Sequence, residues 1–307
     1  MTADMQIVDR AAERPVDVRS ALREGAEFLS RSGMPSARLD VELLLCRALG
    51  CGREELYAGF EAILGAGEIE RFHLLLRRRA QREPVSYITG HREFWSLDFD
   101  VTPQVLVPRP ETELLVEVAV DILREGSSPS RVLEIGTGSG AIAVALATER
   151  KDAGIWATDL SSGALEVARH NARRHGVEDR VRFLQGDLFE PVGQWGQGFF
   201  DLMVSNPPYI PRREIEVLSA EIRNWEPRLA LDGGEDGLDF YRRLFCDGHL
   251  FLASGGCVAL EIGAGRGDEV LRLLELQGAY SPGTVYRDYA GRERVVAAQK
   301  LPSDAVC

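Results

Sequence analysis

The segment Val132-Leu-Glu-Ile-Gly-Thr-Gly-Ser-Gly140 is the strongest indication of the fold of this 307-residue chain. A short apolar strand leads into three alternating glycines, and the apolar run 141–147 continues as a helix. Glycine adopts positive φ without strain, and it lets backbone amides approach a ligand closely. The stretch therefore predicts a strand, a ligand-binding turn and a helix, which together form the first unit of a nucleotide-binding α/β sheet.

Strands and helices alternate through residues 111–307, which we assign to one domain. The expected helices cover 113–124, 141–150, 163–175, 238–252 and 268–276, and the expected strands cover 131–135, 155–158, 181–185, 200–205, 257–262, 285–289 and 294–299. This alternation predicts an open, mostly parallel sheet of seven strands with helices on both faces. Ligands of such Rossmann-like sheets bind at the carboxyl ends of the strands, so the glycine turn marks the expected site.

The chain before this domain has a different character. Residues 18–82 predict a small helical bundle with helices near 18–30, 37–49 and 68–82, in which the basic stripe Arg71–Arg82 fits either a solvated face or a partner contact. Residues 83–110 contain several prolines and alternating apolar residues, which favour a hairpin linker. Residues 1–17 are charged and lack an apolar signal core, so we expect a flexible leader.

Charge is unevenly distributed along the chain, whose formal net charge is −12. Residues 18–90 carry 11 Arg and Lys against 10 Asp and Glu, whereas residues 91–307 carry 23 against 34. Enzymes of nucleic acids usually present a basic surface to the phosphates, so a nucleic-acid substrate is disfavoured. The five cysteines are odd in number without C-x-x-C spacing, which argues against disulfides and a metal site. No apolar stretch approaches the roughly 20 residues of a membrane span, so we expect a cytoplasmic protein.

A carboxylate supports the first glycine turn as a cofactor site. Asp159 follows the next expected strand, and a carboxylate there can accept hydrogen bonds from both hydroxyls of a ribose. NAD enzymes also bind a ribose with such a carboxylate, so the glycine turn and Asp159 together do not identify the cofactor. A second glycine loop, Leu260–Gly267, also follows a strand, but Asp268 and Glu269 open its helix and would repel an anionic group. We interpret this second glycine loop as a structural turn.

The tetrapeptide Asn206-Pro-Pro-Tyr209 follows the expected strand 200–205 and carries the chemistry. Its prolines fix φ and make the turn rigid. An amide or aromatic amine nitrogen is a poor nucleophile, because its lone pair is delocalised. The side-chain oxygen of Asn206 and the backbone carbonyl of Pro207 can each accept one N–H, which aims that lone pair at a methyl donor, while Tyr209 stacks on the planar group. The tetrapeptide predicts methyl transfer to a planar nitrogen and leaves glutamine, adenine and cytosine open.

Further segments complete a resemblance to the bacterial release-factor glutamine methyltransferases. They are Glu83-Pro-Val-Ser-Tyr-Ile-Thr-Gly90, Arg92-Glu-Phe-Trp-Ser-Leu97, Val107-Pro-Arg-Pro-Glu-Thr-Glu113, Arg287–Tyr289 and Glu293–Val295, so the resemblance covers about residues 18–300. It implies a class I methyltransferase fold with an antiparallel last strand, S-adenosyl-L-methionine as cofactor, and a helical domain that binds the substrate protein. The implied substrate is the glutamine amide in the Gly-Gly-Gln motif of class I peptide chain release factors. We expect the enzyme to be a monomer.

The resemblance also assigns roles to individual residues. It implies that the cofactor is bound by Gly136, Thr137, Gly138, Ser139, Gly140, Asp159, Asp187, Leu188 and Asn206. Leu188 stands where some relatives have Trp, so it can pack on the adenine but cannot stack. The glutamine pocket is expected to be lined by Asn206, Pro207, Pro208, Tyr209, Phe94, Arg109 and Glu111. For Arg109, a structural salt bridge is an equal alternative.

Three alternatives remain open at this point. A glutamine methyltransferase of a large-subunit ribosomal protein shares the fold, cofactor and tetrapeptide, although the segments 92–97 and 108–113 favour the release-factor branch. An adenine-N6 DNA methyltransferase requires a DNA-recognition region and a basic cleft, which the near-neutral helical domain and the acidic C-terminal domain do not supply. A non-catalytic binding module with this fold is disfavoured by the intact glycine loop and tetrapeptide.

Overall fold

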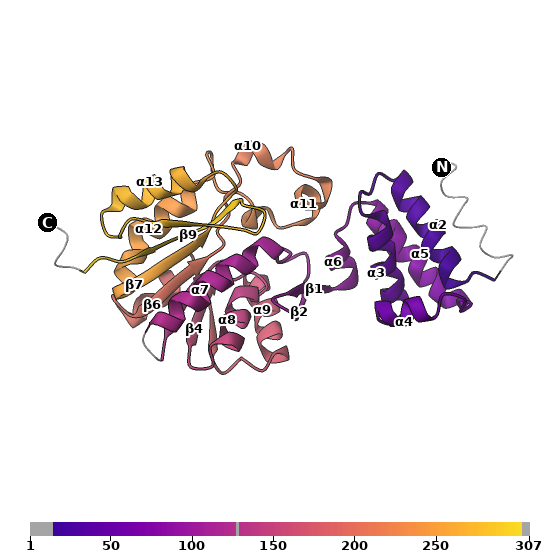
Figure 1. Cartoon of the computed structure of the whole chain (residues 1–307), viewed down its shortest axis with the longest axis horizontal. Helices are drawn as coiled ribbons and strands as arrows, with labels where there is room; N and C mark the ends of the chain where they lie inside the picture. Colours follow the sequence, from indigo (N-terminus) through magenta and orange to yellow (C-terminus); the bar gives the residue numbers. More distant parts are fainter. Residues whose placement is uncertain (1–14, 127–128, 303–307) are drawn as a thin grey trace. The chain divides into compact units, whose positions relative to one another are not determined.

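The computed structural model describes residues 15–126 and 129–302, so most of the expected leader lies outside the described residues. The chain forms two compact units, and Figure 1 labels many of their helices and strands. Unit 1 comprises the chain up to Gly90 together with Ala220–Trp225, and unit 2 comprises His91–Ser219 and the chain from Glu226 onward. No helix within the described ranges is long and apolar enough to cross a membrane. The same residues contain no group of three or more His, Cys, Asp and Glu suited to a metal.

Unit 1 is a bundle of helices. They are α2 (Val18–Arg31), α3 (Ala37–Leu49), α4 (Arg53–Ala58), α5 (Ala66–Ala80), α6 (Val85–Thr89) and α11 (Ala220–Trp225). The apolar stripes that predicted the long helices bury Leu29 and Leu45 in one core. Asp17 caps α2 by accepting a hydrogen bond of 2.8 Å from the backbone N–H of Ser20, and Gly50 ends α3 at a φ of 69°. Asp17, expected in the leader, is therefore the cap of the first described helix.

The short helix α11 belongs to unit 1 although it lies far along the chain. Arg79 and Arg82 each donate to Oε1 of Glu221 over 3.3 Å. Arg79 is only 5% exposed, and it also donates to Asp40 over 2.7 Å. Arg79 therefore lies in the interior of unit 1, where a buried guanidinium requires carboxylate partners, and the partly exposed Arg82 shares one of these partners.

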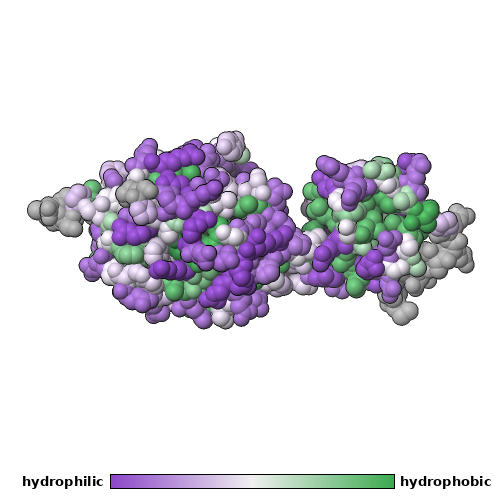
Figure 2. Space-filling model, turned by 90° about the horizontal axis from the view of Figure 1, so that it is seen from below, coloured by the Kyte–Doolittle hydropathy of each residue, from purple (hydrophilic) through white to green (hydrophobic). Residues whose placement is uncertain are grey.

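Unit 1 also carries large apolar side chains on its surface. Four of them are exposed to solvent, namely Leu39, Tyr57, Ile63 and Leu74. Figure 2 shows hydrophobic residues gathered over this unit, at the right of the view. Exposed apolar side chains in such numbers on a small bundle are typical of a surface that contacts another molecule.

The expected hairpin is shorter than the segment 83–110. It consists of β1 (His91–Phe94) and β2 (Leu97–Asp100), which pair antiparallel in unit 2. The preceding residues form α6 instead, which Gly90 ends at a φ of 83°. Trp95 and Ser96 make the two-residue turn with φ of 54° and 56°, a conformation that hairpins of this length require. The backbone N–H of Trp95 donates to Glu113 over 2.8 Å, which holds the hairpin against the next helix.

The seven-stranded sheet of unit 2 confirms the predicted fold class. Its strands are β3 (Arg131–Ile135), β4 (Gly154–Asp159), β5 (Val181–Gln185), β6 (Phe200–Ser205), β7 (Leu252–Glu261), β8 (Thr284–Arg287) and β9 (Glu293–Gln299). They lie in the order β5-β4-β3-β6-β7-β9-β8, with parallel pairs from β5 to β7 and antiparallel pairs around β9. The chain runs outward from β3 to β5 and then places β6 on the other side of β3. The topological switch point therefore lies between β3 and β6, where α/β sheets bind their ligands.

Helices cover both faces of this sheet (Figure 1). One core joins the sheet to α7 (Glu113–Glu125), α8 (Ala141–Glu149) and α9 (Ser162–Arg174). The other core joins it to α12 (Asp239–Phe251) and α13 (Gly267–Gln277). Shorter elements connect the strands and helices, namely η3 (Pro110–Thr112), η4 (Glu190–Trp195), α10 (Arg212–Ile215) and η5 (Arg228–Ala230). The strands are apolar on both faces because both faces are covered.

Candidate active site

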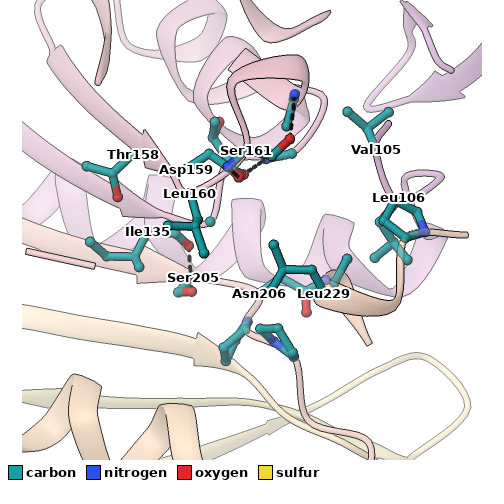
Figure 3. A pocket seen from close by; sticks show the side chains of 18 of the residues that line it. Val105, Leu106, Ile135, Thr158, Asp159, Leu160, Ser161, Ser205, Asn206 and Leu229 are labelled. Carbon is teal, nitrogen blue, oxygen red and sulfur yellow. Dashed lines mark hydrogen bonds between the residues drawn. The ribbon is translucent and has the colours of Figure 1, made fainter. Parts of the chain in front are cut away.

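A pocket of about 930 Å³ opens in unit 2 at the switch point between β3 and β6. Its walls come from the glycine loop, the end of β4, the turn after β6, the segments 104–109 and 227–230, and α12. Figure 3 shows Val105 and Leu106 across the pocket from Thr158 and Asp159, with Asn206 and Leu229 between the two sides. The volume is within the usual range of small-molecule sites.

The glycine loop forms part of the pocket wall, as the sequence predicts. Gly136 and Gly138 adopt φ of 75° and 55°, and a Cβ on either would project into open space. Thr137 and Ser139 line the pocket with them, whereas Gly140 lies behind it. Gly140 has a φ of 80°, and a Cβ there would approach the Cα of Ala168 in α9 to 3.1 Å. Gly140 therefore serves the close packing of α8 on α9, and the other glycines keep the pocket wall free of side chains.

The acidic residue before the loop, Glu134, was not singled out by the sequence analysis. Its side chain is fully buried, and Oε2 accepts a hydrogen bond of 2.8 Å from the hydroxyl of Thr137. The other oxygen, Oε1, has no hydrogen-bond partner within the described part of the chain. Burial raises the pKa of Glu134 to about 8. A carboxyl group inside an otherwise apolar strand was the available signal, because such a group requires a partner.

Asp159 ties the end of β4 to the glycine loop. Its Oδ2 accepts from the backbone N–H of Gly138 over 2.9 Å, and its Oδ1 accepts from the backbone N–H of Ser161 over 2.9 Å. Burial raises the pKa of Asp159, although these backbone donors act in the opposite direction. Each oxygen keeps a further lone pair, so the carboxylate can accept additional hydrogen bonds from a molecule in the pocket.

Asp187 and Leu188 line the pocket beside β4. Leu188 adopts a φ of 46°, and its carbonyl accepts a hydrogen bond of 3.3 Å from the hydroxyl of Thr158. Its side chain is buried and provides an apolar patch without an aromatic ring. Asp187 forms an ion pair with Arg243, which also lines the pocket. The carboxylate of Asp187 thus already has a cationic partner.

The tetrapeptide places an oriented amide at the switch point. Ser205, the last residue of β6, donates its hydroxyl to the carbonyl of Ile135 over 2.6 Å, which links the two central strands (Figure 3). Asn206 follows, and its Nδ2 donates to Oγ1 of Thr112 over 3.2 Å. With the nitrogen engaged, the carbonyl oxygen of this amide is left to accept from a molecule in the pocket. Pro207 and Pro208 also line the wall.

Tyr209 does not line the pocket, contrary to the expectation from the sequence. Its ring packs against the core under α12 and α13, and its Cδ2 lies 3.3 Å from the position that a Cβ on Gly263 would take. Burial, together with the nearby Glu261, raises the pKa of Tyr209 to about 12. The second glycine loop therefore packs against the tetrapeptide. Its last residue, Gly267, donates its backbone N–H to Glu293 over 3.0 Å, so that helix start already has an acceptor.

The three remaining substrate-site candidates lie in different surroundings. Phe94 is 1% exposed and packs edge-on against Phe99 in the core, so the expectation that it borders the pocket is wrong. Arg109 does line the pocket, and its Nη2 donates to both carboxylate oxygens of Glu226 over 2.7 Å. Glu111 is half-buried outside the pocket lining, with its Oε1 3.8 Å from Nη2 of Arg294. Of the three residues, Arg109 lines the pocket and the other two do not.

Two parts of the wall were missed by sequence reasoning. Thr112 is buried in the segment 108–113, which was used only for the resemblance, and it contacts Asn206 directly. The segment 227–230 follows α11 and contributes Leu229, whose side chain is 53% exposed at the pocket. No local pattern announces either role, because both depend on where distant parts of the chain meet.

Comparisons with known proteins agree with this geometry. Two family models match, described as "PrmC N-terminal domain" over residues 20–90 and "Methyltransferase small domain" over residues 111–235. The release factor glutamine methyltransferase of Geobacter sulfurreducens is 44% identical over 92% of this chain and 96% of its own length. That of Moorella thermoacetica is 44% identical over 92% of this chain and 98% of its own. The hMettl16 catalytic domain, solved in complex with a 3′UTR hairpin, is 18% identical with a TM-score of 0.54 over 73% of this chain and 84% of that one, which shows a similar fold.

Proposed function

The chain belongs to the family of release factor glutamine methyltransferases, and we propose that it transfers a methyl group from S-adenosyl-L-methionine to a glutamine side-chain amide nitrogen of a release factor. The acceptor is the glutamine of the Gly-Gly-Gln motif in class I peptide chain release factors. One observation carries the proposal: the amide of Asn206 and the glycine loop line the same pocket. The family membership supplies the release factor, which the pocket alone would leave open.

The pocket fits the proposed cofactor. Its sulfonium amino acid has an ammonium group, and the buried Oε1 of Glu134 beside the glycine loop lacks a partner among the described residues. Its ribose has two hydroxyls, and Asp159 keeps lone pairs for both. Its carboxylate suits the start of α8, because the N-terminal end of a helix attracts anions. Its adenine suits the apolar surface of Leu188. We propose Gly136, Thr137, Gly138 and Ser139 as the loop that holds it.

The mechanism follows from the orientation of Asn206. When bound, the cofactor supplies a methyl group that is open to nucleophilic attack. The side-chain oxygen of Asn206 and the backbone carbonyl of Pro207 accept the two N–H hydrogens of the glutamine amide, which turns its lone pair toward that methyl group. The amide nitrogen becomes acidic once it is methylated, so its proton passes to water. Since no histidine lines the pocket within the described residues, positioning takes the place of a general base.

We propose that unit 1 recognises the release factor. Its match to the PrmC N-terminal domain model and its exposed apolar side chains support this role. Among the described residues, those that line the pocket all belong to unit 2. We propose a monomer as the active form. Release factors work on the ribosome, so we place the reaction in the cytoplasm.

The decisive experiment combines the full chain with methyl-labelled S-adenosyl-L-methionine and a purified class I release factor. We expect label in the native factor and none in a factor whose Gly-Gly-Gln glutamine is replaced by alanine. Equal label in both would contradict the proposed acceptor. Parallel reactions with large-subunit ribosomal protein and with DNA test the two alternative substrates, and transfer confined to either would replace the release factor as the substrate.

A further inference from the structure

A chain of polar side chains stands behind Asn206. The amide nitrogen of Asn206 donates to Oγ1 of Thr112 over 3.2 Å. The Thr112 hydroxyl in turn lowers the pKa of the Glu261 carboxyl group, as a hydroxyl that faces a carboxylate does, and Oε2 of Glu261 is buried without a hydrogen-bond partner among the described residues. Thr112 is 5% exposed and is the last residue of η3, directly before α7, while Glu261 is 1% exposed at the end of β7. Three segments that are far apart in sequence therefore meet at one amide.

When Glu261 is ionised, the hydrogen bonds that join Asn206, Thr112 and Glu261 can run in only one direction. A carboxylate only accepts hydrogen bonds, so the single hydroxyl hydrogen of Thr112 is directed at Glu261. Oγ1 of Thr112 can then only accept from Asn206, and the amide must present its NH2 group to Thr112. The amide oxygen is thereby turned to the pocket, where the glutamine N–H is to be received.

We propose that Thr112 and Glu261 are positioning residues that fix the orientation of the Asn206 amide, an inference that rests on the proposed function. Without them, the amide can rotate by half a turn and present a donor to the glutamine N–H. A donor facing a donor repels the substrate group that must be aligned, so the reactive geometry is lost while the cofactor site stays intact.

The surroundings of Glu261 make this arrangement sensitive to pH. Glu261 is faced by charged or titratable groups from the segment before α7, the tetrapeptide, α12 and β9, namely Arg109, Glu111, Tyr209, Tyr241 and Arg294. Burial raises the pKa of Glu261 to about 7, with Arg294 and the Thr112 hydroxyl acting in the opposite direction. Below that pH the protonated carboxyl can donate to Thr112, which frees the Thr112 hydroxyl to donate to Asn206. The orientation of the Asn206 amide is therefore fixed only above the pKa of Glu261.

The test measures methylation of purified release factor by the full chain and by Thr112→Val, which keeps the shape of the side chain and removes its hydroxyl. We expect kcat to fall about 10- to 100-fold, with the Kd for S-adenosyl-L-methionine within about twofold of the unsubstituted chain. Thr112→Ser retains a hydroxyl and is expected to restore most of kcat. Thr148→Val removes a hydroxyl that donates only to the backbone of α8, and it serves as the matched control.

Two outcomes would overturn the proposal: Thr112→Val with unchanged kcat, or Thr112→Ser as impaired as Thr112→Val. A second variant decides the matter if Thr112→Val does not fold. Glu261→Gln cannot ionise, so the loss of kcat below pH 7 that we expect of the unsubstituted chain should be absent from this variant. Persistence of that acid limb in Glu261→Gln would also overturn the proposal. Absence of any transfer by the unsubstituted chain would instead count against the proposed function.

Discussion

The backbone N–H of Gly138 donates to the carboxylate of Asp159 over 2.9 Å, so the glycine loop and the end of β4 form one rigid wall of the pocket. The bond joins the loop that follows the first strand to the carboxylate that follows the second. The shape of the loop and the position of the carboxylate are therefore set together, before any ligand arrives. This pre-organisation lowers the conformational cost of binding a nucleotide-like molecule.

The first prediction concerns this bond. Asp159→Ala removes both the tether of the loop and the expected acceptor for the ribose hydroxyls, and a hydrogen bond to a charged group contributes about 1.5–3 kcal/mol. We expect the Kd for S-adenosyl-L-methionine to rise about 10- to 100-fold in isothermal titration calorimetry. Asp121→Ala, which removes an exposed carboxylate paired with Arg124, should leave the affinity unchanged. Equal affinities for all three proteins would remove Asp159 from the site.

The second prediction separates backbone strain from packing. Gly140 and Gly176 both have positive φ, of 80° and 65°, but only a Cβ at Gly140 would meet Ala168. We expect Gly176→Ala to lower the free energy of unfolding by about 1 kcal/mol through strain alone. Gly140→Ala should lower it by about 2–4 kcal/mol, because overpacking of α8 on α9 is added. Urea denaturation followed by circular dichroism measures the free energy of unfolding of both variants. Equal losses would contradict the prediction, because they would show that α8 and α9 accommodate the added methyl group without a loss of stability.

The third prediction divides binding from chemistry within the pocket. Asn206→Ala removes the acceptor for the glutamine N–H but leaves the glycine loop in place, so methylation should fall by about 10²–10³-fold while cofactor affinity largely persists. Gly138→Val should instead abolish cofactor binding, since the new side chain would project from the pocket wall into the space that the cofactor needs. Calorimetry with the cofactor and a methylation assay with the release factor distinguish the two variants. A loss of affinity in Asn206→Ala as large as in Gly138→Val would contradict this division.

The fourth prediction follows from the buried carboxyl group of Glu134. Its pKa rises from 4.5 to about 8 on folding, so the folded protein holds this proton more firmly than the unfolded chain does. Its contribution to the free energy of unfolding is therefore greatest below pH 4.5 and declines as pH rises to about 8, by an amount on the order of a few kcal/mol. Glu134→Gln removes this decline, so between pH 5 and 8.5 its Tm should fall less with rising pH. Parallel Tm profiles for the two proteins would show that Glu134 does not titrate in this range.

Much of the fold could be read from local patterns. The strands 131–135, 181–185 and 200–205 were predicted with their observed bounds, because each is a short, mostly apolar segment that a turn ends. The class of the sheet followed from the alternation of such strands with helices. The glycine loop and Asn206 followed from motifs whose residue types the backbone conformation and the chemistry both require.

Other features could not be read, because they arise where distant segments meet. The ring of Tyr209 turns to Gly263 because the second glycine loop leaves room for it there, and nothing in the tetrapeptide itself shows this. Phe94 belongs to a hairpin whose alternation was recognised, but the face that the hairpin buries was not. The link from Thr112 to Asn206 spans 94 positions of the sequence. Such contacts are set by tertiary packing, which local patterns do not encode.

Because α11 belongs to unit 1, a chimaera between this protein and a relative must exchange two separate stretches of sequence together. Unit 1 is assembled from two separate stretches, so the backbone passes between the units at three points. A fragment that stops at Gly90 lacks Glu221 and leaves the buried Arg79 with one carboxylate partner fewer. A gene fusion that exchanges only the first ninety codons between distant relatives would therefore pair one parent's arginines with the other parent's α11. Functional chimaeras should be those in which both stretches come from the same parent.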